Sequence, residues 1–187
     1  MDIFAHGLWS GAAAKALNNK TEKSGIGKKL SMWQTVFWGV MPDLFAFTIP
    51  FIAIIWGLML GTVNLSDLHR VDTGEPPPTD TLWFLNLANS LYNISHSLIV
   101  FSLVFILVWI LMKKPYLEFG AWVLHILIDI PTHSYKFFPT PFLWPVSSFK
   151  FNGFSWADSW FMMLNYSAII VVYLLLYRKK ISKKTQK

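Results

Sequence analysis

The feature that most constrains this chain is an apolar run at residues 98–112, LIVFSLVFILVWILM, which contains no charged side chain. Extended back to position 91, it matches the roughly 20 residues that a helix needs to cross a bilayer. In lipid, a spanning segment must satisfy its own backbone hydrogen bonds. Across the 187 residues, 54% are hydrophobic and only 14% are charged, as in integral membrane proteins. The sequence therefore predicts an all-α, polytopic transmembrane helical bundle.

We expect a single membrane domain over residues 1–187, with about four or five membrane helices. The expected elements are a short helix at 1–17, spans at 32–60, 91–112, 115–130 and 157–177, and outer loops at 61–81 and 135–156. Proline lacks an N–H donor and disfavours helical geometry in the preceding residue. The first span is therefore predicted to break at Pro42-Asp43, and the helix at 115–130 to end before Pro131.

Lysine and arginine cluster beside the apolar runs, at residues 20–29, 113–114 and 178–187. Such blocks mark the cytoplasmic side of membrane proteins, so the C-terminus is predicted to be cytoplasmic. The loops at 61–81 and 135–156 then lie at the outer face. The net charge of +6 does not indicate nucleic-acid binding, because the charge is confined to these blocks.

The segment at 120–134, GAWVLHILIDIPTHS, carries His125, Asp129 and His133 at spacings of four residues. Residues four apart lie on one face of a helix, and imidazole and carboxylate are both metal ligands. In an apolar run such groups are costly unless they meet a metal, a partner or water. His133 follows Pro131 and is expected off that face. The alternative is a satisfied core histidine beside a helix-end aspartate.

Three further ligand-type residues, His6, Asp43 and His96, are expected at the same membrane depth. Each has a plain structural interpretation when taken alone. His6 could be a packed terminal residue, Asp43 a helix cap and His96 a satisfied interfacial histidine. A depth shared with His125 and Asp129 favours a metal site, because intramembrane ionisable groups are usually functional. Cysteine is absent, which excludes thiolate ligands and cysteine nucleophiles.

Several short motifs occur in a definite order along the chain. They are HG at 6–7, MPD at 41–43, SHSL at 95–98, GxxxxHxxxD at 120–129 and LWP at 143–145. This order resembles the YdjM-like family of membrane-bound metal-dependent hydrolases. The order of the ligands is also similar to that in bacterial zinc-dependent phospholipase C. The sequence departs from the YdjM-like pattern at Phe45, which replaces the second carboxylate of a PDxD motif. It also departs at Tyr92-Asn93, which occupy the region where the family usually has a His-Arg pair.

The resemblance implies a membrane-embedded hydrolase that binds one or two divalent metal ions. Zinc is the expected ion. The full set of expected ligands is His6, Asp43, His96, His125, Asp129 and His133. One ion would be held by the four central residues of this set. A second would be held by His6 and bridged by Asp129, and His133 is a local replacement ligand. His96 and Asp129 are the expected catalytic residues.

Two metal ions together can activate water for phosphoester hydrolysis. The expected substrate is therefore a lipid phosphoester, such as a phospholipid or a polyprenyl phosphate, with membrane lipids as partners and no nucleic acid. Lys136 and Lys150 could hold its phosphate or could simply anchor the loop at the interface. The expected location is a bacterial cytoplasmic membrane, with the site toward the outer face.

Two alternative functions stay open. The first is a metal-binding or metal/proton transport protein that uses the same residues. The inner halves of the predicted spans, such as 103–112 and 171–177, are almost purely apolar, which favours a one-sided pocket over a transport pathway. The second is a structural protein whose metal site has decayed, as the replacement at Phe45 would suggest.

Overall fold

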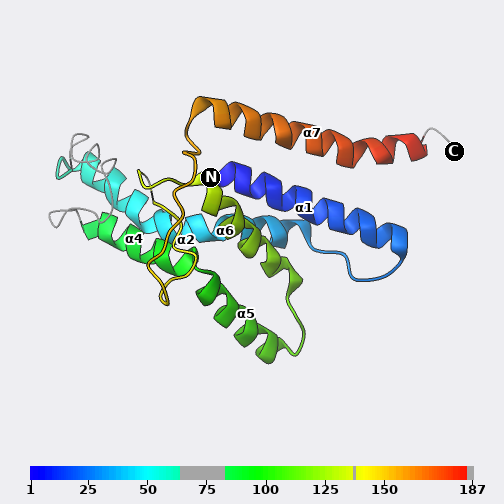
Figure 1. Cartoon of the computed structure of the whole chain (residues 1–187), viewed down its shortest axis with the longest axis horizontal. Coiled ribbons are helices and arrows are strands. Elements are labelled where there is room, and N and C mark those ends of the chain that lie inside the picture. Colours follow the sequence, from blue (N-terminus) through cyan, green and yellow to red (C-terminus); the bar gives the residue numbers. More distant parts are fainter. Residues whose placement is uncertain (64–82, 137, 185–187) are drawn as a thin grey trace.

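The computed structural model describes residues 1–63, 83–136 and 138–184, and these contain helices and no strand. The elements are α1 (Ile3–Ser24), α2 (Met32–Met59), α4 (Trp83–Ser95), α5 (Leu98–Met112), the 3₁₀ turn η2 (Leu117–Phe119), α6 (Gly120–Thr132) and α7 (Ser159–Lys184). Helix α7 lies beside α1, and α4 lies beside the second half of α2 (Figure 1). The predicted all-α helical bundle is confirmed.

Two helices are long and apolar enough to cross a bilayer, namely α2 and the Ser159–Arg178 part of α7. Helices α4 and α5 pass the same test together as a bent pair, which gives at most three candidate spans among the described residues. Helix α6 has only 13 residues, or about 20 Å at the helical rise. That is shorter than a hydrocarbon core of about 30 Å, so the expected count of four or five spans is not confirmed.

Helix α2 is continuous through Pro42, so the break expected at Pro42-Asp43 is not observed. A proline leaves the carbonyl four residues earlier without its helical donor. The next carbonyl along, that of Gly39, accepts a hydrogen bond of 2.7 Å from Nδ1 of His125 on α6. This bond adds a contact between α2 and α6 beside the proline, while α2 itself continues without a break.

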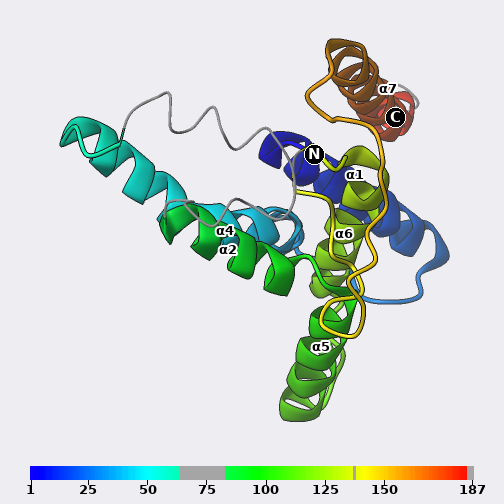
Figure 2. The same ribbon diagram turned by 60° about the vertical axis from the view of Figure 1, so that its left-hand side comes forward.

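The span predicted at 91–112 is instead divided at His96 and Ser97, where the helix axis bends by 60°. Figure 2 shows α5 turning away from the α2–α4 pair at this point. Ser97 has an extended backbone, and its hydroxyl oxygen accepts bonds from two amides in the first turn of α5. It also donates to the carbonyl of Trp144, while the first amide of α5 donates to the carbonyl of Phe142. The break is therefore stabilised by a helix cap and by the loop that follows α6.

The remaining differences between the prediction and the structure concern the boundaries of the helices and loops. Helix α1 continues past the predicted end at residue 17 to Ser24, and α7 extends to Lys184. Helix α6 begins at Gly120 rather than at residue 115, and it passes through Pro131 instead of ending before it. Of the predicted outer loop at 61–81, residues 64–81 lie outside the described residues, whereas 135–156 contains no helix.

Helices α1 and α2 pack closely against each other at Gly39. A Cβ atom on Gly39 would lie 2.0 Å from Oγ and 2.5 Å from Cβ of Ser10 on α1. Real Cβ atoms do not approach other atoms so closely, and the Cβ of Ser10 cannot rotate away. The absence of a side chain at Gly39 therefore sets the spacing of the two helices, and with it the position of His6 on α1.

We expect Gly39→Ala to lower the free energy of unfolding by about 1–3 kcal/mol, as is typical of overpacking. Gly120→Ala is the matched control, because no atom lies within 4 Å of its added Cβ. Thermal unfolding in detergent micelles would compare the two variants. Ser10→Gly should restore the stability of the Gly39→Ala protein. Equal stability of the Gly39→Ala and Gly120→Ala variants would contradict the close contact.

Candidate metal centre

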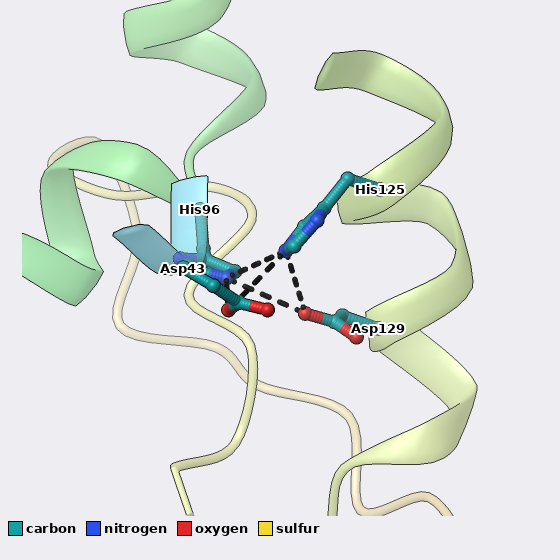
Figure 3. Close-up of side chains that lie close together, drawn as sticks. All are labelled: Asp43, His96, His125 and Asp129. Atoms are coloured by element: carbon teal, nitrogen blue, oxygen red, sulfur yellow. Dashed lines mark hydrogen bonds and ion pairs between the residues drawn. The ribbon is translucent and has the colours of Figure 1, made fainter. Parts of the chain in front are cut away.

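Four of the predicted ligands come together in the interior of the protein. Asp43 projects from the middle of α2, His96 from the break between α4 and α5, and His125 and Asp129 from successive turns of α6 (Figure 3). One ligand atom from each of the four lies within 4.8 Å of the other three. Among the described residues, no other group of His, Asp and Glu side chains meets this criterion.

The cluster is almost completely shielded from solvent. The side chains of His96, His125 and Asp129 are no more than 1% exposed, and that of Asp43 is 13% exposed. Two carboxylates and two imidazoles are the donor set of a zinc or other first-row metal site. Placing two carboxylates in such a setting is costly unless a cation compensates them.

The distances between the ligand atoms match one tetrahedral ion. Nε2 of His96 and Nε2 of His125 are 3.0 Å apart. Oδ1 of Asp43 lies 3.4 and 3.6 Å from these two nitrogens, and Oδ2 of Asp129 lies 3.4 and 3.2 Å from them. Bonds of about 2.1 Å would place tetrahedral ligands about 3.4 Å apart. The cluster can therefore hold a metal ion.

Hydrogen bonds on the outer side of the imidazoles leave Nε2 available to an ion. Nδ1 of His125 faces the carbonyl of Gly39 at 2.7 Å and must be its donor, so the neutral ring has a lone pair on Nε2. Nδ1 of His96 lies 2.9 Å from Oγ of Ser95 and 3.3 Å from the carbonyl of Tyr92. If both rings are neutral with Nδ1 protonated, two lone pairs face each other, and a cation between them removes the repulsion.

Oδ2 of Asp129 points into the same space. This oxygen is buried and has no hydrogen-bond donor among the described residues. A buried carboxylate oxygen without a donor costs free energy that a metal–oxygen bond would recover. The lack of a hydrogen-bond donor to this oxygen is therefore a further indication that the cluster accommodates a cation.

The other oxygen of Asp129 faces a second group of residues. Nε2 of His6 lies 2.9 Å from Oδ1, and Nε2 of His133 lies 3.4 Å from it. The amino group of Met1 contacts Oδ1 and lies 2.8 Å from Nε2 of His133. The ring of His6 stacks on that of His125, with centroids 3.6 Å apart. Asp129 thus links the four-residue cluster to His6 and His133.

His133 reaches this position although it follows the last residue of α6. Its backbone is extended, as expected beyond the helix, and its Nε2 nevertheless lies 3.4 Å from Oδ1 of Asp129. The loop after α6 holds it, because Gly153 N–H donates to the carbonyl of His133 and Nδ1 of His133 pairs with the carbonyl of Phe138 at 2.9 Å. A Cβ atom on Gly153 would lie 2.2 Å from the carbonyl oxygen of Pro131. Only glycine permits this close pairing.

The structure also shows supporting groups that the sequence pattern did not indicate. The carbonyl of Gly39 and the hydroxyl of Ser95 orient the two imidazoles, and no motif marks either role. Lys136, for which the sequence allows either phosphate binding or interfacial anchoring, is exposed and lines an open surface pocket of about 720 Å³. The lining of that pocket includes no member of the four-residue cluster.

Comparisons with protein-family models, with curated proteins and with solved structures found no match for this chain. The interpretation of the site therefore depends on its residues and their geometry.

Proposed function

We propose that this protein is a membrane-embedded, metal-dependent hydrolase that cleaves a lipid phosphoester, such as a phospholipid or a polyprenyl phosphate. The observation that carries the proposal is the buried Asp43–His96–His125–Asp129 cluster with its unpartnered carboxylate oxygen. The choice of reaction follows from the resemblance of the motif order to YdjM-like hydrolases and of the ligand order to bacterial phospholipase C.

Zinc is the proposed ion in the four-residue cluster, because nitrogen and carboxylate ligands at tetrahedral separations suit it best. The proposed second position lies at Oδ1 of Asp129, with His6 and His133 as its other ligands. Nδ1 of His6 is buried and makes no hydrogen bond among the described residues, and Nε2 lies 2.9 Å from Oδ1 of Asp129, which supports a ligand role for Nε2. Asp129 would then bridge two ions, an arrangement that can bind phosphate oxygens and activate water. His96 and Asp129 would be the catalytic ligands.

The metal contents of three variants test the bridged pair. We expect His6→Ala, and equally His133→Ala, to lose one of two equivalents, because the four-residue cluster stays complete. Asp129→Asn should lose most of both, since it removes the negative charge shared by two dications. Elemental analysis of purified, folded protein gives these numbers. Asp158→Asn, at an exposed carboxylate in the loop, is the control and should keep full metal. A full metal complement in Asp129→Asn would rule out the bridge.

Turnover tests the hydrolase itself. Purified protein should release phosphate or a phosphorylated headgroup from a lipid in a broad panel, and chelation should abolish the release. His96→Ala should lower the rate by more than about 100-fold, beyond the effect of a typical outer-shell change. Added metal should restore chelated wild-type protein but not this variant. Metal-loaded protein with no metal-dependent turnover on any lipid would exclude the enzyme.

A second candidate function is a structural or metal-storing membrane protein. One observation favours it: all four tetrahedral positions are filled by protein ligands, which is typical of closed structural sites. In the hydrolase, one ligand must give way to water or substrate, and Asp43 is the most exposed of the four. Bound metal without turnover is the result expected for this second candidate.

The proposed location is a bacterial cytoplasmic membrane with the C-terminus in the cytoplasm and the site toward the outer face. The basic blocks at 20–29, 113–114 and 178–187 support this orientation. Reporter fusions after Lys114 and after residue 187 should give cytoplasmic signals, and one within residues 74–79 an external signal. A cytoplasmic signal from residues 74–79 would be incompatible with an outer-face site.

A further inference from the structure

We infer that Tyr92 is a positioning residue for the metal centre, because its ring fixes the orientation in which His96 presents Nε2 to the ion. The inference rests on the metal binding proposed above. It extends that proposal to a residue that ligates nothing itself.

Tyr92 and His96 are one helical turn apart, and their rings lie face to face. The ring centroids are 3.7 Å apart and the planes are inclined by 24°. The amide of His96 donates to the carbonyl of Tyr92 at 2.9 Å, which continues the hydrogen bonding of α4 by one residue. Tyr92 is 1% exposed, so the stacked pair is fully enclosed.

His96 needs such support because of its place in the chain. It lies at the bend between α4 and α5, where the next residue, Ser97, already has an extended backbone. The only polar contacts of its Nδ1 among the described residues are with the neighbouring Ser95 and with the carbonyl of Tyr92. These two contacts come from the imidazole edge, and the ring of Tyr92 adds a restraint on the imidazole face, so the stacked ring contributes to fixing where Nε2 points.

Two other aromatic side chains hold Tyr92 in place. Phe47 on α2 and Phe138 in the loop after α6 lie with ring centroids 5.8 and 5.4 Å from that of Tyr92. The two also pack edge to face against each other, at 5.4 Å. Phe138 has a φ of 42°, a conformation that non-glycine residues rarely adopt. The fold thus keeps Phe138 in a strained backbone conformation that places its ring against Tyr92.

The same residue also reaches the second group of histidines. The hydroxyl of Tyr92 lies 3.4 Å from Nδ1 of His133, whose Nε2 faces Oδ1 of Asp129. One side chain therefore contacts a ligand of the four-residue cluster and a residue on the opposite side of Asp129.

Tyr92→Leu removes the stacking face, and we expect the affinity for Zn²⁺ to fall about 10–100-fold, as for other outer-shell changes. Tyr92→Phe keeps the stacking and should bind Zn²⁺ as the wild type does. Phe84→Leu is the matched control, because Phe84 is an equally buried aromatic on α4 and lies about 18 Å along the helix from His96. It should lose stability without losing affinity.

Affinity is measured by competition with a chromogenic chelator, and ligand geometry by the visible absorption of Co²⁺-loaded protein. The Co²⁺ spectrum should change in Tyr92→Leu and not in Phe84→Leu. If Tyr92→Leu does not fold, Phe138→Ala replaces it, since it removes packing behind Tyr92 and should shift both readouts in the same direction.

Wild-type affinity and an unchanged Co²⁺ spectrum in Tyr92→Leu, or in Phe138→Ala as its replacement, would overturn the role of Tyr92 while leaving the metal centre intact. Wild-type protein that binds neither Zn²⁺ nor Co²⁺ would overturn the metal centre itself, and the positioning role with it.

Discussion

A carboxylate buried in an apolar protein must be compensated by cations or hydrogen-bond donors, and Asp129 imposes this requirement on the rest of the structure. Its Oδ1 faces His6, His133 and the amino group of Met1. Its Oδ2 faces the two imidazoles of the four-residue cluster and has no hydrogen-bond donor among the described residues. The start of α1, the end of α6 and the break between α4 and α5 all converge on this one side chain.

The contacts that build the fold are also the contacts that build the site. His125 supports α2 near Pro42 through Nδ1 and offers Nε2 to the cluster. Helix α4 ends at Ser95 and Ser97 caps the start of α5, and this break places His96 beside α6. Since each residue serves both purposes, the helices cannot be rearranged without moving the ligands. This dependence explains how short helical segments hold four ligand atoms at tetrahedral separations.

The hydrolase and the structural metal site differ in one physical respect, namely whether a coordination position can exchange. Four protein ligands can complete a tetrahedron and leave no place for water. In the proposed hydrolase, the contacts that Asp129 makes through Oδ1 and the greater exposure of Asp43 offer ways to open a position. The chemistry of the donor set is common to both functions, and the mobility of one carboxylate distinguishes them.

The sequence by itself determined the helical class, since long apolar runs in lipid favour helices, and the spacing of His125 and Asp129 indicated these two as candidate ligands. It did not locate the helix breaks. Proline at position 42 predicted an interruption that α2 does not show, whereas the observed break, at Ser97, has no proline beside it. The decisive hydrogen-bond partners are remote: the donor to Gly39 is 86 residues away, and the acceptor for Ser97 is 47 residues away. Local patterns report neighbours along the chain, and only the folded chain brings these distant groups together.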